Sequence, residues 1–277
     1  SSRDMIRPQR LLTGSKIGLI TPASYIDEAE LRKAVASLEG LGLKVVMGNN
    51  IRALYGGMAG KDAERLADLH SMFADPEIKG IWCARGGYGA ARLLDKLDYD
   101  LIRRNPKVFV GYSDITALHC AIQQHCQLVT FLGPSGNSAF TDYTKAELQQ
   151  AVFEPPSEHV IRIADAQMEE AKRDAAFLPR TIAPGTAEGE LTGGNLSLLA
   201  ALAGTGYLPT LAGTLLCLEE VGERPYRIDR MLTTLRQAWP LEQAAGILLG
   251  VCVDCEAKEG IRSLSLQDTL TDRLGDL

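Results

Sequence analysis

The chain has 277 residues, of which 45% are hydrophobic and 23% are charged, and this composition is typical of a globular protein with one large or two medium domains. Its net charge of −6, with scattered lysines and arginines, argues against a nucleic-acid-binding surface, which requires a basic excess. No apolar run reaches the roughly 18 to 20 residues of a membrane-spanning helix, so we expect a soluble protein without a membrane partner.

The chain begins SSRDMIRPQRLLTG, without an initiating methionine or an apolar signal core. Whether a tag or a targeting segment has been removed stays open at this point. We expect a cytoplasmic protein, with an exported form as the alternative.

In the first half of the chain, short apolar runs alternate with amphipathic segments. Expected strands cover 16–24, 43–48, 78–84, 107–111 and 127–134, and expected helices cover 27–42, 61–75, 88–97 and 115–125. Strands and helices alternate in this way when parallel strands are joined by crossover helices. The sequence therefore predicts an N-terminal α/β domain with a Rossmann-like parallel sheet over residues 1–150.

The second half of the chain begins with a segment of different composition. Residues 150–190 carry prolines and charges with little periodicity, so we expect an inter-domain crossing over 151–187 with two short β segments. After it, the turn LTGGN precedes expected helices at 195–205, 226–239 and 265–276 and expected strands at 213–221 and 245–253. This predicts a smaller C-terminal α/β domain over 188–277. We expect it to be truncated, because the sequence stops where another strand should begin.

The six cysteines lie mostly in apolar runs, which predicts buried free thiols rather than disulfides. Cys252 and Cys255 have the C-x-x-C spacing of a redox or zinc half-site, but neither a second pair nor a histidine cluster accompanies them. We therefore expect no metal and no other cofactor.

Ser113 lies in the stretch KVFVGYSDITALHC, between an expected strand and an expected helix. In open α/β sheets ligands bind at the carboxyl ends of the strands, where a serine can hold its Oγ toward a substrate. The motif G-Y-S-D-I lacks the second glycine of the hydrolase elbow, and serine is also a common N-cap residue. The residues alone leave a nucleophile and a helix cap open.

Two further stretches carry potential chemistry. Adjacent glycines in ARGGYGAARLL (84–94) can turn backbone N–H groups toward an anion, although a tight turn without function explains them equally well. The run LCLEEVGERPYRIDR (216–230) places Glu219 and Glu220 on opposite faces of a strand, so that one can face a crevice while the other stays solvated. A buried glutamate there would complete a nucleophilic triad, whereas an exposed one would have no role.

Taken in order, ITPAS, ARGGYGAARLL, VGYSDITALH, TFLGP, LTGGNLSLLAALAGT and LCLEEVGERPYRIDRML resemble the LD-carboxypeptidase family of serine peptidases. The resemblance runs from about residue 16 to the end of the chain. The family includes murein tetrapeptide carboxypeptidases and, more distantly, microcin C immunity peptidases.

The resemblance implies a catalytic site whose residues come from both domains. Ser113 matches the nucleophile, Glu219 matches the triad acid, and the N–H groups of Gly86 and Asp114 match the oxyanion hole. Asn195 resembles a residue lining the substrate cleft. The implied reaction is hydrolysis of the amide between an L-centre and the C-terminal D-alanine of a murein tetrapeptide, without a metal. The resemblance to this family also suggests a homodimer.

The sequence departs from the family pattern in its histidines. The family places the triad histidine on a strand after the glutamate, but the four histidines here are His70, His119, His125 and His159. We expect that the chain lacks a C-terminal segment that supplies this residue. An earlier histidine is one alternative, although His119 should point away from the Ser113 Oγ. An inactive relative that binds peptidoglycan fragments is the other.

A runner-up function is an immunity-type peptidase that acts on an aminoacyl-nucleotide toxin. Such an enzyme needs aromatic side chains to stack on a nucleobase, and the chain has only two tryptophans, Trp82 and Trp239. A nucleotide-binding protein is disfavoured because the glycine loops match neither the dinucleotide fingerprint nor the Walker loop.

Overall fold

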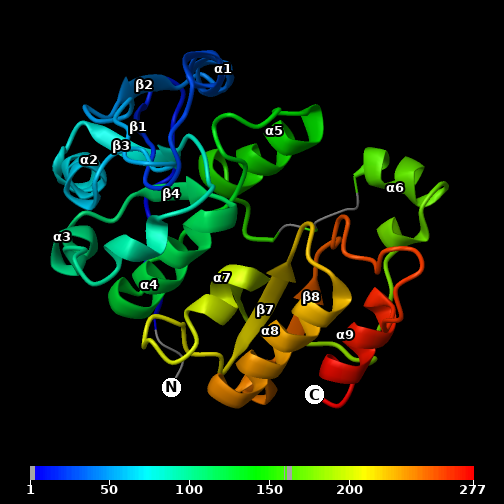
Figure 1. The fold of residues 1–277 in the computed structure, drawn as a ribbon. Helices are drawn as coiled ribbons and strands as arrows, with labels where there is room; N and C mark the ends of the chain where they lie inside the picture. Colours follow the sequence, from blue (N-terminus) through cyan, green and yellow to red (C-terminus); the bar gives the residue numbers. More distant parts are fainter. Residues whose placement is uncertain (1–3, 159, 161–163) are drawn as a thin grey trace. The chain divides into compact units, whose positions relative to one another are not determined.

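The computed structural model describes residues 4–158, 160 and 164–277 (Figure 1). The chain forms two compact units, which divide between residues 159 and 160. Among the described residues, no helix is both long and apolar enough to cross a membrane.

The first unit contains a sheet of five parallel strands in the order β2-β1-β3-β4-β5. Their bounds are β1 Lys16–Ile20, β2 Lys44–Met47, β3 Ile78–Cys83, β4 Val108–Gly111 and β5 Phe131–Leu132. The residues at the centres of β3 and β4 are apolar or small, and they are buried. This pattern is typical of strands that are covered on both faces. The predicted parallel α/β sheet is confirmed.

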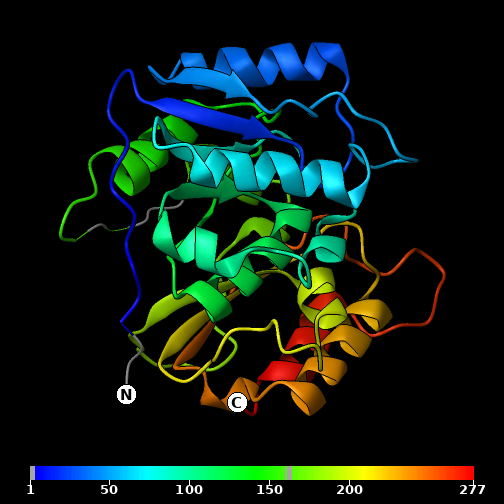
Figure 2. The same cartoon turned by 90° about the vertical axis from the view of Figure 1, so that its left-hand side faces the viewer.

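Helices cover both faces of this sheet, as Figure 1 shows. They are α1 Glu28–Glu39, α2 Asp62–Ala74, α3 Tyr99–Arg104, α4 Thr116–Cys126 and α5 Asp142–Leu148. Leu31 of α1 and Leu148 of α5 share one core cluster with Leu19 of β1. On the other face, Phe73 of α2 stacks against Phe109 of β4. Figure 2 shows α1 and α2 on opposite sides of β1.

The second unit contains three parallel strands in the order β6-β7-β8. Its elements are β6 Glu190–Asn195, α7 Leu196–Ala201, β7 Thr214–Glu219, α8 Pro225–Ala238, β8 Gly246–Leu249 and α9 Leu266–Leu274. α8 packs against both α7 and α9, and Figure 2 shows α8 and α9 side by side. Ile228, Leu232 and Leu235 form the buried stripe of α8, at the spacing of an amphipathic helix. The predicted smaller α/β domain is confirmed.

Two expected elements of the first unit are wrong. The helix expected at 88–97 is only a 3-10 turn, Ala90–Leu93, because Gly87 and Gly89 before it have φ angles of +104° and +116°. These two glycines therefore lie outside any helix, and the expected helix cannot start at 88. The long strand expected at 127–134 shrinks to the two residues of β5.

Near the crossing, α6 Asp165–Ala171 is an element that we did not expect. The described part of 151–187 contains no strand, while 159 and 161–163, within the range of the two expected β segments, lie outside the described residues. The expected turn LTGGN forms most of β6. Its glycines pair with β7, and a Cβ on Gly193 would lie 2.1 Å from the Cys217 carbonyl oxygen, so the small residues serve close strand packing.

Candidate active site

Ser113 lies directly after β4, in a strained turn. Its φ of +58° is left-handed, a conformation that costs a residue with a side chain roughly 1 to 2 kcal/mol. The 3-10 turn Ser113–Ile115 and α4 both begin without a side-chain cap, and the Ser113 hydroxyl makes no hydrogen bond to the described residues. The helix-cap alternative is therefore wrong. Strain of this kind concentrates at functional sites.

Two glycines allow this turn to form. A Cβ on Gly111 would lie 2.5 Å from Cγ2 of Ile115, so the chain could not turn sharply there with a larger residue. A Cβ on Gly86 would lie 3.1 Å from both the Ser113 Cβ and the Tyr112 carbonyl oxygen. The glycine-rich loop after β3 thus packs directly against the serine turn.

We call residues 84–90 the glycine loop. Hydrogen bonds hold it at both ends: the Tyr88 N–H donates to Ser24 Oγ at 2.9 Å, and the Ala90 N–H donates to Asp114 Oδ2 at 2.8 Å. In contrast, neither the Gly86 nor the Asp114 N–H donates to any group that the structure describes. The Asp114 nitrogen lies 3.5 Å from where a Gly86 Cβ would be. The structure therefore gathers Ser113 and two unused backbone donors.

The Asp114 side chain is buried beneath this turn, at 4% exposure. Burial raises the pKa of its carboxyl group, while the hydrogen bond from Ala90 and the positive charge of Arg65 oppose this rise. The Asp114 carboxylate therefore accepts a hydrogen bond within the fold, from the Ala90 N–H, whereas the Asp114 backbone N–H has no acceptor among the described residues.

In the second unit, β7 ends in two glutamates that share one partner. The Asn195 side-chain nitrogen donates to Glu219 Oε1 at 3.1 Å and to Glu220 Oε1 at 3.3 Å. Glu220 also accepts hydrogen bonds from the N–H and the hydroxyl of Ser197, at 2.8 and 2.6 Å. Glu219 is half-buried and Glu220 is buried, so the two glutamates differ in how far they are exposed to solvent.

Asn195 was expected to line a substrate cleft. Its side chain is 7% exposed, and its Oδ1 also accepts from the Leu198 N–H as the N-cap of α7. The amide is thus engaged at both ends, and its contacts include the bond to Glu219.

The three described histidines make their contacts away from Ser113. His70 Nε2 accepts from the Asp98 N–H, and the His125 ring packs on Tyr99. His119 is buried in α4, where its Nε2–H donates to the Gly111 carbonyl oxygen at 2.9 Å. His159 lies outside the described residues.

His119 gives a prediction for the pH dependence of stability. Burial lowers its pKa from 6.5 to about 4, so the unfolded chain takes up a proton in a range where the folded chain does not. The free energy of unfolding should fall as the pH drops from 6.5 to 4, by on the order of 3 kcal/mol from this residue. Urea unfolding at several pH values measures it. Asparagine at 119 does not titrate, so the free energy of unfolding of His119→Asn should fall less than that of the wild type over this pH range. Equal falls in the two proteins would contradict a lowered pKa of His119.

Cys252 and Cys255 follow β8. All six cysteines of the chain are free, and four of them are buried. Burial raises the pKa of the Cys252 thiol to about 12, so this thiol stays protonated at neutral pH. Among the described residues, no group of three or more histidine, cysteine or acidic side chains is arranged to hold a metal ion.

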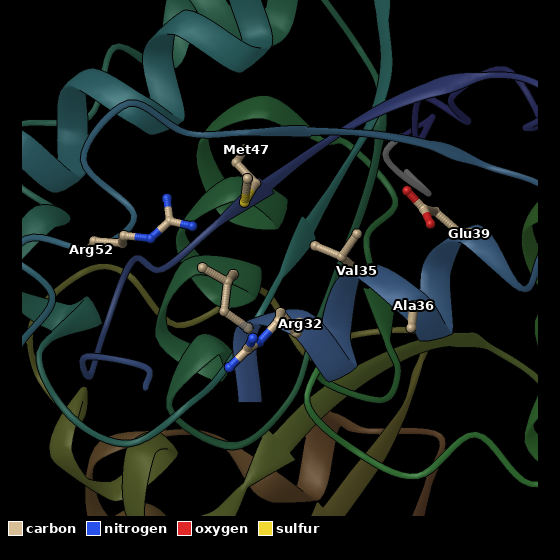
Figure 3. A pocket seen from close by; sticks show the side chains of 7 residues that line it. Arg32, Val35, Ala36, Glu39, Met47 and Arg52 are labelled. Carbon is tan, nitrogen blue, oxygen red and sulfur yellow. The ribbon is translucent and has the colours of Figure 1, made fainter. Parts of the chain in front are cut away.

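The structure also contains two surface cavities. One, of about 260 Å³, opens between α1 and β2 (Figure 3), and its labelled side chains include Met47, Val35 and Arg52. β1 and β3 separate β2 from β4, so this cavity does not adjoin Ser113. The other, of about 550 Å³, lies in the second unit at the start of α8. Two of its three arginines, Arg224 and Arg227, are paired with acids.

Arg65 is a buried residue that the sequence interpretation missed. It lies in α2 on the same face as Leu69 and Met72, at positions i, i+4 and i+7. An arginine in an otherwise apolar stripe was the available signal, because a buried charge must be fully paired.

Comparison with known proteins places the chain among carboxypeptidases. Residues 17–133 match the profile of the LD-carboxypeptidase N-terminal domain, and residues 188–277 match that of the C-terminal domain. The "Probable murein peptide carboxypeptidase" of Bacillus subtilis (strain 168) is 42% identical over 272 residues, which are 96% of this chain and 81% of that protein. The "Murein tetrapeptide carboxypeptidase" of Pseudomonas aeruginosa is 36% identical, covering 90% of this chain and 80% of that protein.

Solved structures show the same fold. A crystal structure of an MccF-like protein from Bacillus anthracis str. Ames has a TM-score of 0.80 at 30% identity, covering 98% of this chain and 86% of that one. A muramoyltetrapeptide carboxypeptidase from Oxalobacter formigenes has a TM-score of 0.78 at 27% identity, covering 92% and 83%.

Proposed function

The chain belongs to the LD-carboxypeptidase family of serine peptidases, and from this membership we propose that it removes the C-terminal D-alanine of murein tetrapeptides. The named activity of the relatives from Bacillus subtilis and Pseudomonas aeruginosa supports murein peptides as the substrate class.

One local observation carries the proposal: a serine in left-handed backbone beside two unused N–H donors. In the proposed reaction, the Ser113 Oγ attacks the carbonyl carbon before D-alanine and gives its proton to a base. The N–H groups of Gly86 and Asp114 stabilise the negative charge that develops on the carbonyl oxygen. The protonated base then gives the proton to the nitrogen of D-alanine, which leaves. Water hydrolyses the remaining ester and frees Ser113.

Glu219 has the proposed role of orienting the base. A half-buried carboxylate can hold an imidazole in one tautomer and stabilise its protonated form. The Asn195 bond fixes one oxygen of Glu219. We assign the base itself to none of the three described histidines, because each makes its contacts elsewhere.

The test is release of free D-alanine from a murein tetrapeptide, detected with D-amino-acid oxidase. It should be run on the full-length protein. A matched peptide that ends in L-alanine, read by mass spectrometry, controls for stereochemistry. We expect release from the D-terminal peptide alone. A folded protein that releases no D-alanine would overturn the proposal.

The immunity-type alternative belongs in the same assay, because an MccF-like protein shares the fold at 30% identity. Both tryptophans are buried: Trp82 donates to the Pro134 carbonyl oxygen and Trp239 to that of Pro209. Neither is therefore placed to stack on a nucleobase. An aminoacyl-sulfamoyl nucleoside should remain intact; its cleavage in preference to the tetrapeptide would favour the alternative.

A further inference from the structure

A buried guanidinium, that of Arg65, binds the glycine loop at the Gly89 carbonyl oxygen. The Arg65 side chain is fully buried, with no exposed surface. All five of its N–H donors have an acceptor. These acceptors are the carbonyl oxygens of Pro22, Gly60 and Gly89, the Asp62 carboxylate and the Met58 sulfur.

These contacts join separate loops at the carboxyl edge of the sheet. Pro22 follows β1, and Gly89 belongs to the glycine loop after β3. One nitrogen of the guanidinium, Nη1, lies 2.8 Å from both of their carbonyl oxygens. Arg65 therefore fixes the glycine loop to the loop after β1.

Asp114 is a second anchor of the glycine loop. The two anchors are adjacent along the chain, because Arg65 binds the Gly89 carbonyl oxygen and Asp114 binds the Ala90 N–H. Gly86 lies in the same loop, and its packing against Ser113 leaves little freedom for a residue with a side chain. The two anchors therefore bind the loop three and four residues after Gly86.

We propose that Arg65 is a positioning residue for the oxyanion hole: it holds the glycine loop so that the N–H groups of Gly86 and Asp114 face one point beside the Ser113 Oγ. This inference rests on the proposed function for its catalytic consequence. Its structural basis is the five-donor contact of Arg65, which a lysine cannot reproduce, since its single nitrogen has three donors and no planar fork.

Arg65→Lys tests the proposal, and Arg92→Lys is the matched control. Arg92 also pairs with Asp62, at 2.9 Å, but its side chain is half-exposed and bonds neither the Pro22 nor the Gly89 carbonyl oxygen. Only its backbone N–H donates to the Gly89 carbonyl oxygen, at 3.2 Å, and a lysine at 92 keeps that N–H. Two quantities are measured in each protein: hydrogen exchange of peptides covering residues 84–90, and kcat and KM for release of D-alanine.

In Arg65→Lys we expect exchange in the glycine loop to accelerate at least about tenfold, and kcat to fall roughly 10- to 100-fold with KM within about threefold, because an oxyanion donor acts in the transition state. Arg92→Lys should match the wild type in both. A folded Arg65→Lys that matches Arg92→Lys in exchange overturns the inference, and so does faster exchange with an unchanged kcat.

The two proposals fail in different ways. If the wild-type enzyme releases no D-alanine, the proposed function fails, and the exchange comparison still decides whether Arg65 holds the loop. If Arg65→Lys does not fold, Asp62→Asn replaces it: this variant removes the ion pair from the same guanidinium, and we expect smaller changes in the same direction. Unchanged exchange in folded Asp62→Asn would then overturn the inference.

Discussion

Ser113→Ala should abolish release of D-alanine, with a fall in kcat of at least about 10³-fold and as much as about 10⁶-fold, as removal of a serine nucleophile does. The expectation follows from the position of the hydroxyl, which is free of hydrogen bonds to the described residues and lies beside two unused N–H donors. The measurement is kcat for the tetrapeptide, with Ser71→Ala, an exposed serine of α2, as the control. Activity retained in Ser113→Ala would remove the residue from the mechanism.

The same position allows a separate test of strain. Alanine at 113 keeps the left-handed cost, whereas glycine adopts φ near +58° freely. Both variants should be inactive, and Ser113→Gly should have the higher free energy of unfolding, by up to about 1 kcal/mol. A Ser113→Gly protein that is less stable than Ser113→Ala would show that the turn is not strained.

Glu219→Gln should lower kcat by roughly 10³- to 10⁴-fold with little change in stability, because an amide cannot stabilise a protonated base as a carboxylate does. Its neighbour provides the matched control. Glu220 accepts from Ser197, Asn195 and the Val221 N–H, so Glu220→Gln should mainly lower the free energy of unfolding, by about 1 to 3 kcal/mol.

The pair of variants separates a catalytic carboxylate from a structural one. Thermal unfolding and kcat are measured on both proteins. A stable Glu220→Gln protein without activity, together with an active Glu219→Gln protein, would reverse the two assignments.

The sequence by itself determined the alternation of strands and helices in the first unit. Apolar runs such as those of β3 and β4 are buried on both faces, and α1 shows helical spacing between Leu31, Ala34 and Leu38, so local periodicity carries the information. The ordered motifs also determined the family, which the profile matches over residues 17–133 and 188–277 confirm.

The periodicity of apolar residues in the sequence did not predict the shortest elements. The sequence predicted neither α6, in the crossing, nor α3. Helices of six or seven residues complete fewer than two turns, so their sequence pattern is too brief to distinguish from a loop, and tertiary packing decides them.

The chemical meaning of individual residues was decided by the tertiary structure. The sequence left Ser113 between a nucleophile and a helix cap, and only the backbone shows a left-handed residue that caps nothing. It could not rank Glu219 against Glu220 by burial, since that depends on Ser197 and Asn195 from another strand and helix. Arg65 shows the same limit: its acceptors lie in loops that are distant along the chain, and only folding gives its buried charge five partners.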